Sequence, residues 1–261
     1  MKSKGLLKLV LILTVVMGGL TALLLFISAK QEANNTYINI NPETMNLIQL
    51  ESPKDGDTIA IVNTTLGELR FVLYPEYSPN AVKNFIELAE SGYYNNTYVF
   101  NSESGAYSAA GSKLKSGEMP EEYDKSRELV ERELHQDLWT FRGAVCSMNT
   151  TVDRSFKEKI LGGGTYFNGS RFMIINSYGM ENDEEKQTLL DNSENKELGQ
   201  AFIDKGGIPN FSQQMTVIGQ VYEGLDVVDA LANLETENSG HYKIPKDDIM
   251  IESIEISEYS D

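Results

Sequence analysis

The chain has 261 residues, of which 41% are hydrophobic, and its single cysteine is Cys146. It carries 39 acidic residues against 22 basic ones, so its formal net charge is −17 at pH 7. This strongly negative balance argues against nucleic acid as a partner, and a single cysteine excludes a disulfide within one chain. The two histidines, His135 and His241, are too few and too isolated to suggest a metal site, so we expect no metal and no cofactor.

The N-terminal stretch from residue 6 to residue 28 is almost wholly apolar, and three lysines lie among the first eight residues. Its length matches the ~20 residues that a helix needs to cross a bilayer. A cleavable signal peptide is the alternative, because Ser28 and Ala29 are small, but a secretory apolar region runs only about 7–15 residues. We therefore predict a cytoplasmic tail (1–5), a transmembrane anchor (6–28) and a domain outside the cell membrane, since lysines keep the N-terminal side in the cytoplasm.

Residues 29–55 are rich in Asn, Glu, Thr and Pro without sustained periodicity, which predicts a linker. The folded domain is expected over residues 56–258. Two segments of alternating apolar and polar residues, 58–65 and 67–74, predict a hairpin with one buried face. Ser78 and Pro79 then suit the start of a short helix that ends near Gly92.

The rest of the chain is expected to be mainly β. Strands are predicted at 143–148, 171–176, 215–221 and 248–256, with a second short helix at 224–234. Many strands with two short helices favour a closed barrel or an α+β sheet over alternating βαβ units. An insertion at about 112–140 contains a charged stretch, 121–138, whose apolar spacing suits an amphipathic helix. Trp139 is expected to pack on its own domain, with partner binding as the alternative, and the acidic run 181–185 is expected to be a solvated loop.

Five segments in this order resemble the signature segments of the cyclophilin-type peptidyl-prolyl isomerases over about residues 57–257. They are LGELRFVLYPEYSPNAVKNFIELAESGYYNNT (66–97), RGAVCSMN (142–149), NGSRFMI (168–174), TVIGQVYEGLDVVDAL (216–231) and IPKDDIMIESIEI (244–256). The resemblance implies a cyclophilin-like eight-stranded antiparallel β-barrel with two capping helices and a peptide groove on its outer surface. Together with the apolar N-terminal stretch, it suggests a divergent, membrane-anchored member of the family. A bacterial member is the easier account, because several Asn-x-Ser/Thr triplets fall in expected strands, where a glycan would obstruct folding.

The reaction of that family shows which residues matter. Resonance holds the bond before proline planar with a barrier of ~18–20 kcal/mol, and uncatalysed isomerisation takes tens of seconds or more. An enzyme needs a pocket for the proline ring and a donor to the proline nitrogen, whose lone pair returns only in the twisted transition state. The resemblance implies that an arginine supplies this hydrogen bond.

That arginine is missing here. The alignment of the segment after the GYY turn places Asn101 in its position, or Ser102 with a slip of one residue. Arg171 stands where similar family members carry glutamine, and it is the candidate replacement donor. The alternative is that Arg171 only pairs with a nearby acid such as Glu103. Because side chains alternate along a strand, Arg171 and Met173 are expected to share the groove face.

The resemblance also implies a set of substrate-binding residues: Tyr107, Ala109, Asn149, Met173, Phe211 and Met215. Losing one charge-assisted hydrogen bond costs ~1.5–3 kcal/mol, which is roughly ten- to over a hundredfold in rate. We therefore predict a prolyl isomerase or folding helper with weakened activity that acts on proline-containing exported polypeptides. The alternative function is a non-catalytic peptide-binding or assembly module on the same scaffold.

Overall fold

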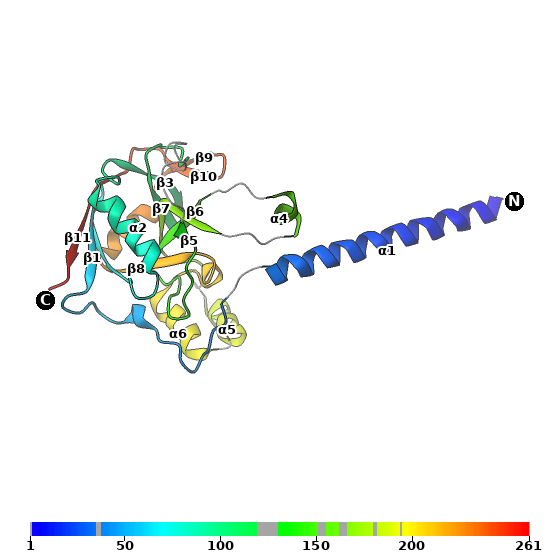
Figure 1. The fold of residues 1–261 in the computed structure, drawn as a ribbon, viewed down its shortest axis with the longest axis horizontal. Helices are drawn as coiled ribbons and strands as arrows, with labels where there is room; N and C mark the ends of the chain where they lie inside the picture. Colours follow the sequence, from blue (N-terminus) through cyan, green and yellow to red (C-terminus); the bar gives the residue numbers. More distant parts are fainter. Residues whose placement is uncertain are drawn as a thin grey trace. The chain divides into compact units, whose positions relative to one another are not determined.

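The computed structural model describes residues 2–34, 38–118, 130–150, 155–161, 166–179, 182–193 and 195–260. The chain forms two compact units (Figure 1). One unit comprises residues 1–37 and 151–165, and the other comprises residues 38–150 and 166–261. The second unit contains the whole β-structure and therefore the region of the expected groove.

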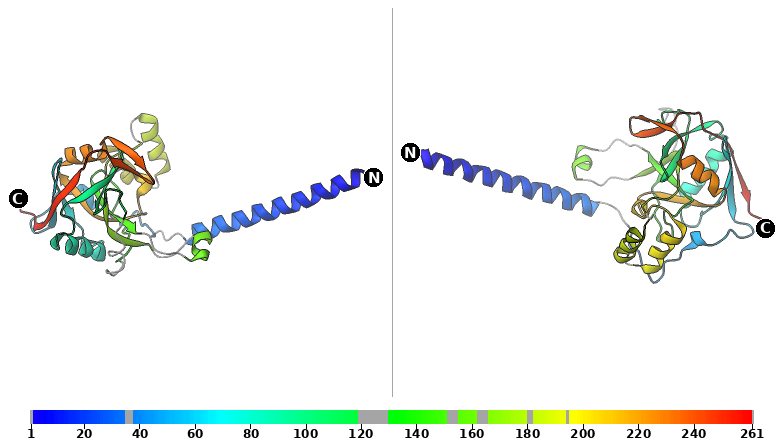
Figure 2. Two further views of the ribbon diagram at one scale, coloured as in Figure 1. Left: turned by 90° about the horizontal axis from the view of Figure 1, so that it is seen from above. Right: turned by 180° about the vertical axis from the view of Figure 1, so that it is seen from behind.

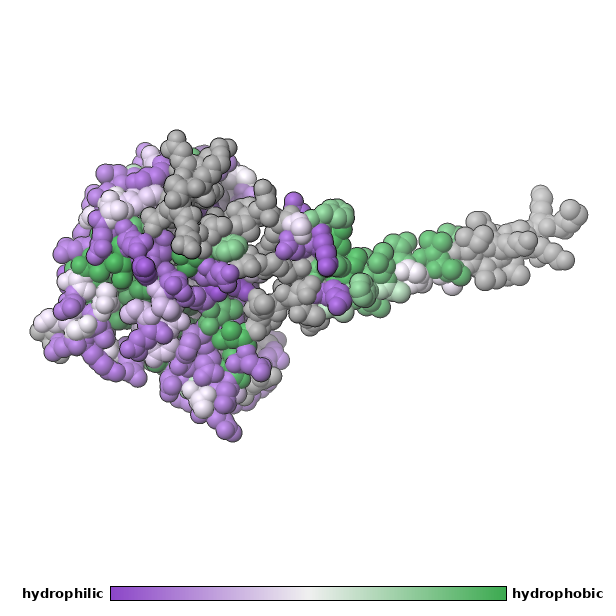
Figure 3. Space-filling model, viewed as in Figure 1, coloured by the Kyte–Doolittle hydropathy of each residue, from purple (hydrophilic) through white to green (hydrophobic). Residues whose placement is uncertain are grey.

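The first unit is built around helix α1, Lys2–Asn34. Its stretch Leu13–Lys30 is long and apolar enough to cross a membrane by length and composition, and none of that stretch is buried. The apolar surface of this stretch contrasts with the largely hydrophilic surface of the other unit (Figure 3). A signal sequence has the same properties, so the structure establishes an apolar N-terminal helix of either kind. The short helix α4, Phe156–Leu161, belongs to the same unit and contacts α1.

The second unit is a closed antiparallel barrel of eight strands. In spatial order they are β4 (Tyr107–Ser112), β3 (Thr97–Glu103), β11 (Met250–Glu258), β1 (Thr58–Thr64), β2 (Gly67–Leu73), β8 (Thr216–Glu223), β6 (Ala144–Thr150) and β7 (Phe167–Ile175). The pairing of β7 with β4 closes the ring, and the two-residue strand β5 (Val130–Glu131) adds to the outer side of β7. The predicted mainly-β fold class is confirmed.

The alternation in the sequence explains the barrel interior. Val62 of β1 and Leu69 of β2 are register partners, and both are fully buried in the largest apolar cluster. Helix α2 (Pro79–Glu90) and helix α7 (Leu225–Ala232) add their apolar faces to this cluster. The last strand pairs with the first, with Val62 opposite Ile254, as the sequence predicts.

The predicted linker, 29–55, does not extend as far as expected. Residues 38–57, which we call the N-terminal strap, pack on the barrel unit and include a single 3-10 turn, η1 (Ile48–Leu50). Gln49 is 4% exposed, and its amide nitrogen donates to the Trp139 carbonyl and the Gln220 side-chain oxygen, both at 2.9 Å. Backbone hydrogen bonds to the Gln136 and Asp137 side chains, the buried Gln49 amide and a few apolar residues attach this strap. Such contacts leave no periodic pattern in the sequence.

The insertions also differ from the prediction. Residues 121–129 of the expected amphipathic helix lie outside the described part of the chain. Its described remainder is not helical, because Val130–Glu131 pairs with β7 and residues 132–138 continue as an irregular segment. Trp139 is buried with Phe141 and Phe202, so it packs on its own domain as expected.

The acidic run is not wholly a solvated loop. Helix α5 (Asp183–Asn192) begins within it and is followed by α6 (Lys196–Lys205). Asn182 accepts from the Glu185 N–H while the Glu185 carboxylate accepts from the Asn182 N–H, so a capping box starts α5. The structure further contains a turn, η2 (Pro209–Phe211), and a hairpin of β9 (Thr236–Ser239) and β10 (Tyr242–Pro245), none of which we predicted. Figure 2 shows the barrel unit and these helices from two further directions.

Candidate peptide groove

The candidate site lies across neighbouring strands on the outer face of the barrel. Asn101 of β3 is the register partner of Ala109 of β4, Ala109 is opposite Met173 of β7, and Met173 is opposite Cys146 of β6. The next residue on β7, Phe172, belongs to the interior cluster. Because side chains alternate along a strand, this row of four residues lies on the outer face.

An apolar cluster covers the outer face beside this row. We call Tyr107, Met148, Met173, Phe211 and Met215 the groove cluster, since all five belong to one packed group that excludes the barrel interior. The rings of Tyr107 and Phe211 are 5.7 Å apart between centroids, and the η2 turn brings Phe211 to this position. All but Met173 remain partly exposed, so the cluster is both packed and accessible.

Four of the six predicted substrate-binding residues therefore lie together: Tyr107, Met173, Phe211 and Met215. Ala109 is buried between Asn101 and Met173, so it forms part of the base of the row. Asn149 lies further along β6, opposite Asn168, and outside the apolar cluster. Its side-chain oxygen is buried and accepts no hydrogen bond from the described residues.

Asn101 occupies the row at the position where the resemblance places an arginine. It is 2% exposed, and its side-chain oxygen accepts a 2.7 Å hydrogen bond from the backbone N–H of Lys243. The Lys243 ammonium group forms an ion pair with Glu103, two residues further along β3. These two contacts fasten the β9–β10 hairpin along β3 and engage the acceptor atom of Asn101.

Arg171 lies on the same strand as Met173 but is 8% exposed. Its guanidinium group donates to the Gly117 carbonyl at 2.6 Å and to the Tyr242 hydroxyl at 3.0 Å. It also lies 5.7 Å from the centroid of the Phe100 ring. The acid expected as its partner, Glu103, pairs with Lys243 instead. In this arrangement the guanidinium group holds the start of the insertion and the β9–β10 hairpin.

Two ionisable groups in the site are held neutral. Burial is the main cause that raises the pKa of the Tyr107 hydroxyl, and the charge of Glu103 adds to it. Burial alone raises the pKa of the Cys146 thiol to about 12, so this cysteine is not a nucleophile at neutral pH. Within the described part of the chain, no group of three or more His, Cys, Asp or Glu side chains is arranged to hold a metal ion.

Sequence reasoning missed Gly117, Tyr242 and Lys243. The Gly240-His241 connection, with a φ of 60° at the glycine, was a usable hairpin signal. Nothing in the local pattern placed that hairpin on β3. Gly117 has a φ of 76°, and an added Cβ there would lie 2.3 Å from the Phe100 ring, so only glycine suits the turn beside Arg171.

The closed eight-stranded barrel, with α2 and α7 packed against its core and an apolar cluster on its outer face, has the architecture of the cyclophilin class. Residues 59–256 match the model of the family described as cyclophilin type peptidyl-prolyl cis-trans isomerase/CLD. The chain therefore belongs to the cyclophilin-type peptidyl-prolyl cis-trans isomerase family.

Relatives agree with this membership. A Staphylococcus saprophyticus protein named "Putative peptidyl-prolyl cis-trans isomerase" is 28% identical over 214 residues, which cover 82% of this chain and 99% of the relative. A Staphylococcus epidermidis protein of the same name is 26% identical over 205 residues, or 78% and 94% of the two chains. The crystal structure of a Cryptosporidium parvum cyclophilin matches with a TM-score of 0.54 and 21% identity, covering 78% of this chain and 99% of that one, and supports the fold.

Proposed function

We propose that this protein binds proline-containing segments of exported polypeptides in the groove cluster and isomerises their prolyl bonds slowly. The observation that supports the proposal is the groove cluster, which is apolar, packed and partly exposed, on the same face as the row that lacks the arginine. Met173 and Phe211 supply an apolar floor suited to a proline ring. Asn149 on β6 supplies a buried side-chain oxygen without a partner among the described residues, and this acceptor suits a peptide N–H.

The low rate follows from the available donors. Asn101 offers a neutral carboxamide, which is a weaker donor than a guanidinium group. Arg171 offers the charge, but to reach a substrate it must leave the Gly117 carbonyl and the Tyr242 hydroxyl. Losing a charge-assisted hydrogen bond in the transition state lowers the rate by roughly ten- to over a hundredfold, and a weaker neutral donor recovers only part of that loss.

A second candidate function is peptide binding without catalysis. The burial of Asn101 and Arg171 favours it. The Asn101 side-chain oxygen accepts from the Lys243 N–H, which fixes that amide, and the Arg171 guanidinium group already donates to the Gly117 carbonyl. The two candidates share the groove and differ only in whether any group can donate to the proline nitrogen. Binding and turnover therefore have to be measured on the same preparation.

The proposed location is the outer side of a cell membrane, with α1 as an uncleaved anchor and the barrel unit extracytoplasmic. The length of Leu13–Lys30 and the lysines that precede it support this orientation. Added protease should digest the barrel unit of wall-stripped cells and spare the anchor. A mature product that begins near Lys30 would show that the segment is a signal peptide.

The deciding experiment is a protease-coupled isomerisation assay on the full chain in detergent. Wild type should exceed the uncatalysed rate by a small factor, and Asn101→Arg should raise kcat/KM by about tenfold or more. Arg171→Gln should remove residual activity if Arg171 is the donor. The matched control is Arg70→Gln, which alters an exposed arginine paired with Glu68 on β2. Peptide binding without any turnover in the wild type would establish the second candidate.

A further inference from the structure

Helix α4 carries an unusually exposed apolar side chain. It lies in the segment between β6 and β7, and Phe156 is 79% exposed, more than any other large hydrophobic residue in the described ranges. Ile160 follows four residues later, on the same face of the helix, and is also exposed. A phenylalanine this exposed packs little against the described part of the chain, so its burial against another surface would be favourable.

The same helix is locally basic in a strongly acidic protein. Lys157 and Lys159 are both exposed, whereas the chain as a whole has a net charge of −17. The intervening carboxylate of Glu158 accepts hydrogen bonds from the backbone N–H and the hydroxyl of Ser155, at 2.7 and 2.6 Å. Glu158 is only partly exposed and keeps its negative charge, so α4 carries two exposed ammonium groups against one partly exposed carboxylate.

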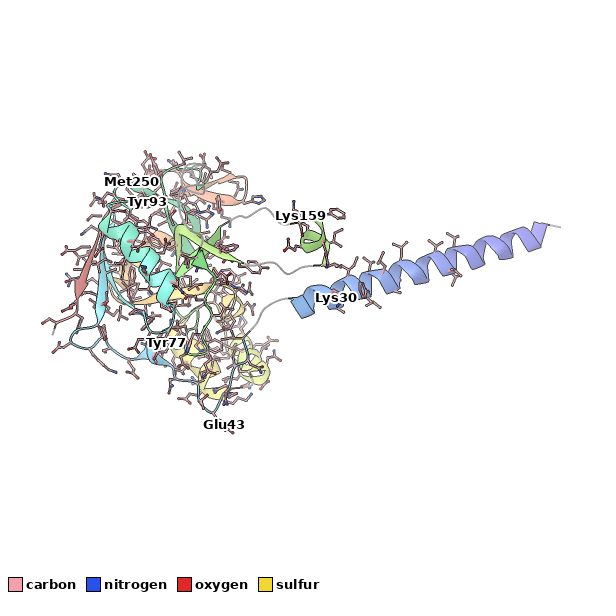
Figure 4. All side chains as sticks on the ribbon, viewed as in Figure 1. Lys30, Glu43, Tyr77, Tyr93, Lys159 and Met250 are labelled. Carbon is pink, nitrogen blue, oxygen red and sulfur yellow. The ribbon has the colours of Figure 1, made fainter. Side chains whose placement is uncertain are left out.

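The position of α4 beside α1 indicates what its exposed apolar and basic side chains contact. α4 and α1 belong to one compact unit and contact each other. Figures 2 and 4 show α4 beside the last turns of α1, where Lys30 ends the stretch that is apolar enough to cross a bilayer. Figure 4 also labels Lys159 on α4. If Leu13–Lys30 spans the hydrocarbon core, the end of that span lies at the level of the lipid headgroups.

We propose that α4 is a membrane-contact helix that binds the surface of an anionic bilayer. Phe156 and Ile160 enter the boundary between headgroups and acyl chains, while Lys157 and Lys159 contact anionic headgroups. An anionic bilayer suits α4 because its headgroups attract the two lysines and its acyl chains bury the two apolar side chains. The inference rests on the proposed anchor. α4 then gives the chain a second membrane contact besides α1.

The test uses the full chain reconstituted in vesicles. Phe156→Cys is labelled with an environment-sensitive fluorophore, and Tyr178→Cys, at a residue 68% exposed in the barrel unit, is the matched control. The native Cys146 is buried and is spared by the reagent, which the labelled wild type checks. The vesicles contain either phosphatidylglycerol with phosphatidylcholine or phosphatidylcholine alone.

The expected result is a roughly threefold rise in emission with a blue shift at position 156 on the anionic vesicles, a smaller change on neutral ones, and no change at position 178. Lys157→Glu combined with Lys159→Glu should abolish the difference between the two lipids. Equal emission at both positions in a chain that floats with vesicles would overturn the role of α4 and leave the anchor standing. Failure of the chain to float would overturn both.

Discussion

The backbone N–H of Lys243 donates a 2.7 Å hydrogen bond to the side-chain oxygen of Asn101. An arginine side chain has no acceptor atom, so an arginine at this position could not make that bond. The seating of the β9–β10 hairpin on β3 and the absence of the arginine are thus linked by geometry. Asn101 therefore fixes the position of the hairpin. The resemblance implies that this residue position would otherwise hold an arginine that donates to the substrate.

Asn101→Ala should test that link. Removing the acceptor leaves the Lys243 N–H without its partner, which should lower the free energy of unfolding by about 1–3 kcal/mol. Urea unfolding measures the change. The same cost should appear in Asn101→Arg, so the arginine variant should gain activity while losing stability. An unchanged unfolding midpoint in Asn101→Ala would show that this hydrogen bond does not hold the hairpin.

Arg171→Gln should destabilise the fold, which differs from the nearly unchanged stability expected of a purely catalytic side chain. The variant loses charge-assisted bonds to Gly117 and Tyr242, and we expect a loss of about 1.5–3 kcal/mol. Thermal unfolding followed by circular dichroism measures it. Tyr242→Phe removes only one of these bonds and should cost about 1 kcal/mol. Loss of isomerase activity in Arg171→Gln with an unaltered melting temperature would support direct catalysis instead.

The N-terminal strap should contribute to stability. A chain that begins at residue 38 should be more stable than one that begins at residue 56, because the latter lacks Gln49 and exposes the buried Trp139 backbone groups. Gln49→Ala alone should cost about 1–3 kcal/mol. Chemical denaturation of the three proteins measures both effects. Equal stability of the two truncated chains would mean that the strap packs on the barrel without adding to its free energy of unfolding.

The sequence predicted the strands and helices of the barrel well, but it did not predict the residues that contact Asn101 and Arg171. The β1–β2 hairpin and α2 follow from local patterns that read the same way in isolation and in the fold. The start of α2 differs from the prediction in one detail, because the Ser78 side chain makes no capping hydrogen bond to the helix. The Ser78 hydroxyl donates to the Val217 carbonyl, and the first N–H groups of the helix donate to the distant Glu133 carboxylate.

The site shows the same limit. The resemblance located Tyr107, Met173 and Phe211, which the structure brings together. The partners of Arg171 lie 54 and 71 residues away in the sequence, and neither carries a charge that would suggest an attraction. Contacts between a buried guanidinium group, a carbonyl and a hydroxyl leave no pattern in the sequence. They appear only once the chain is folded.

The groove cluster should bind proline-containing peptides through Phe211. Phe211→Ala removes the ring that contacts Tyr107 and should weaken binding by roughly five- to thirtyfold, equivalent to about 1–2 kcal/mol. Isothermal titration calorimetry with a proline-containing peptide measures the affinity. Tyr178→Ala, which removes an exposed ring outside the cluster, is the control. Equal affinities for the two variants would place the peptide site elsewhere.

Alkaline pH should destabilise the barrel. The Cys146 thiol has a pKa near 9.0 when unperturbed and about 12 when buried, so above pH 9 the unfolded chain loses a proton that the folded chain keeps. The free energy of unfolding should therefore fall as pH rises, by about 1.4 kcal/mol per pH unit for this group. Burial also raises the pKa of Tyr74, which adds to the fall from about pH 10. In Cys146→Ala, the free energy of unfolding measured in urea should fall less steeply between pH 9 and pH 10.

The N-terminal strap also determines how the barrel responds to mechanical force. The chain arriving from α1 runs along the surface from Ile38 to Asp57 before it enters β1. A pull on the N-terminal side therefore loads the hydrogen bonds of Asn41 with Gln136 and of Asn46 with Asp137 before those of Gln49. Strand β1 is held on both sides by β2 and β11, and it bears tension only after the strap has peeled away. The strap thus takes up force applied at the N-terminal helix before that force reaches the strands of the barrel.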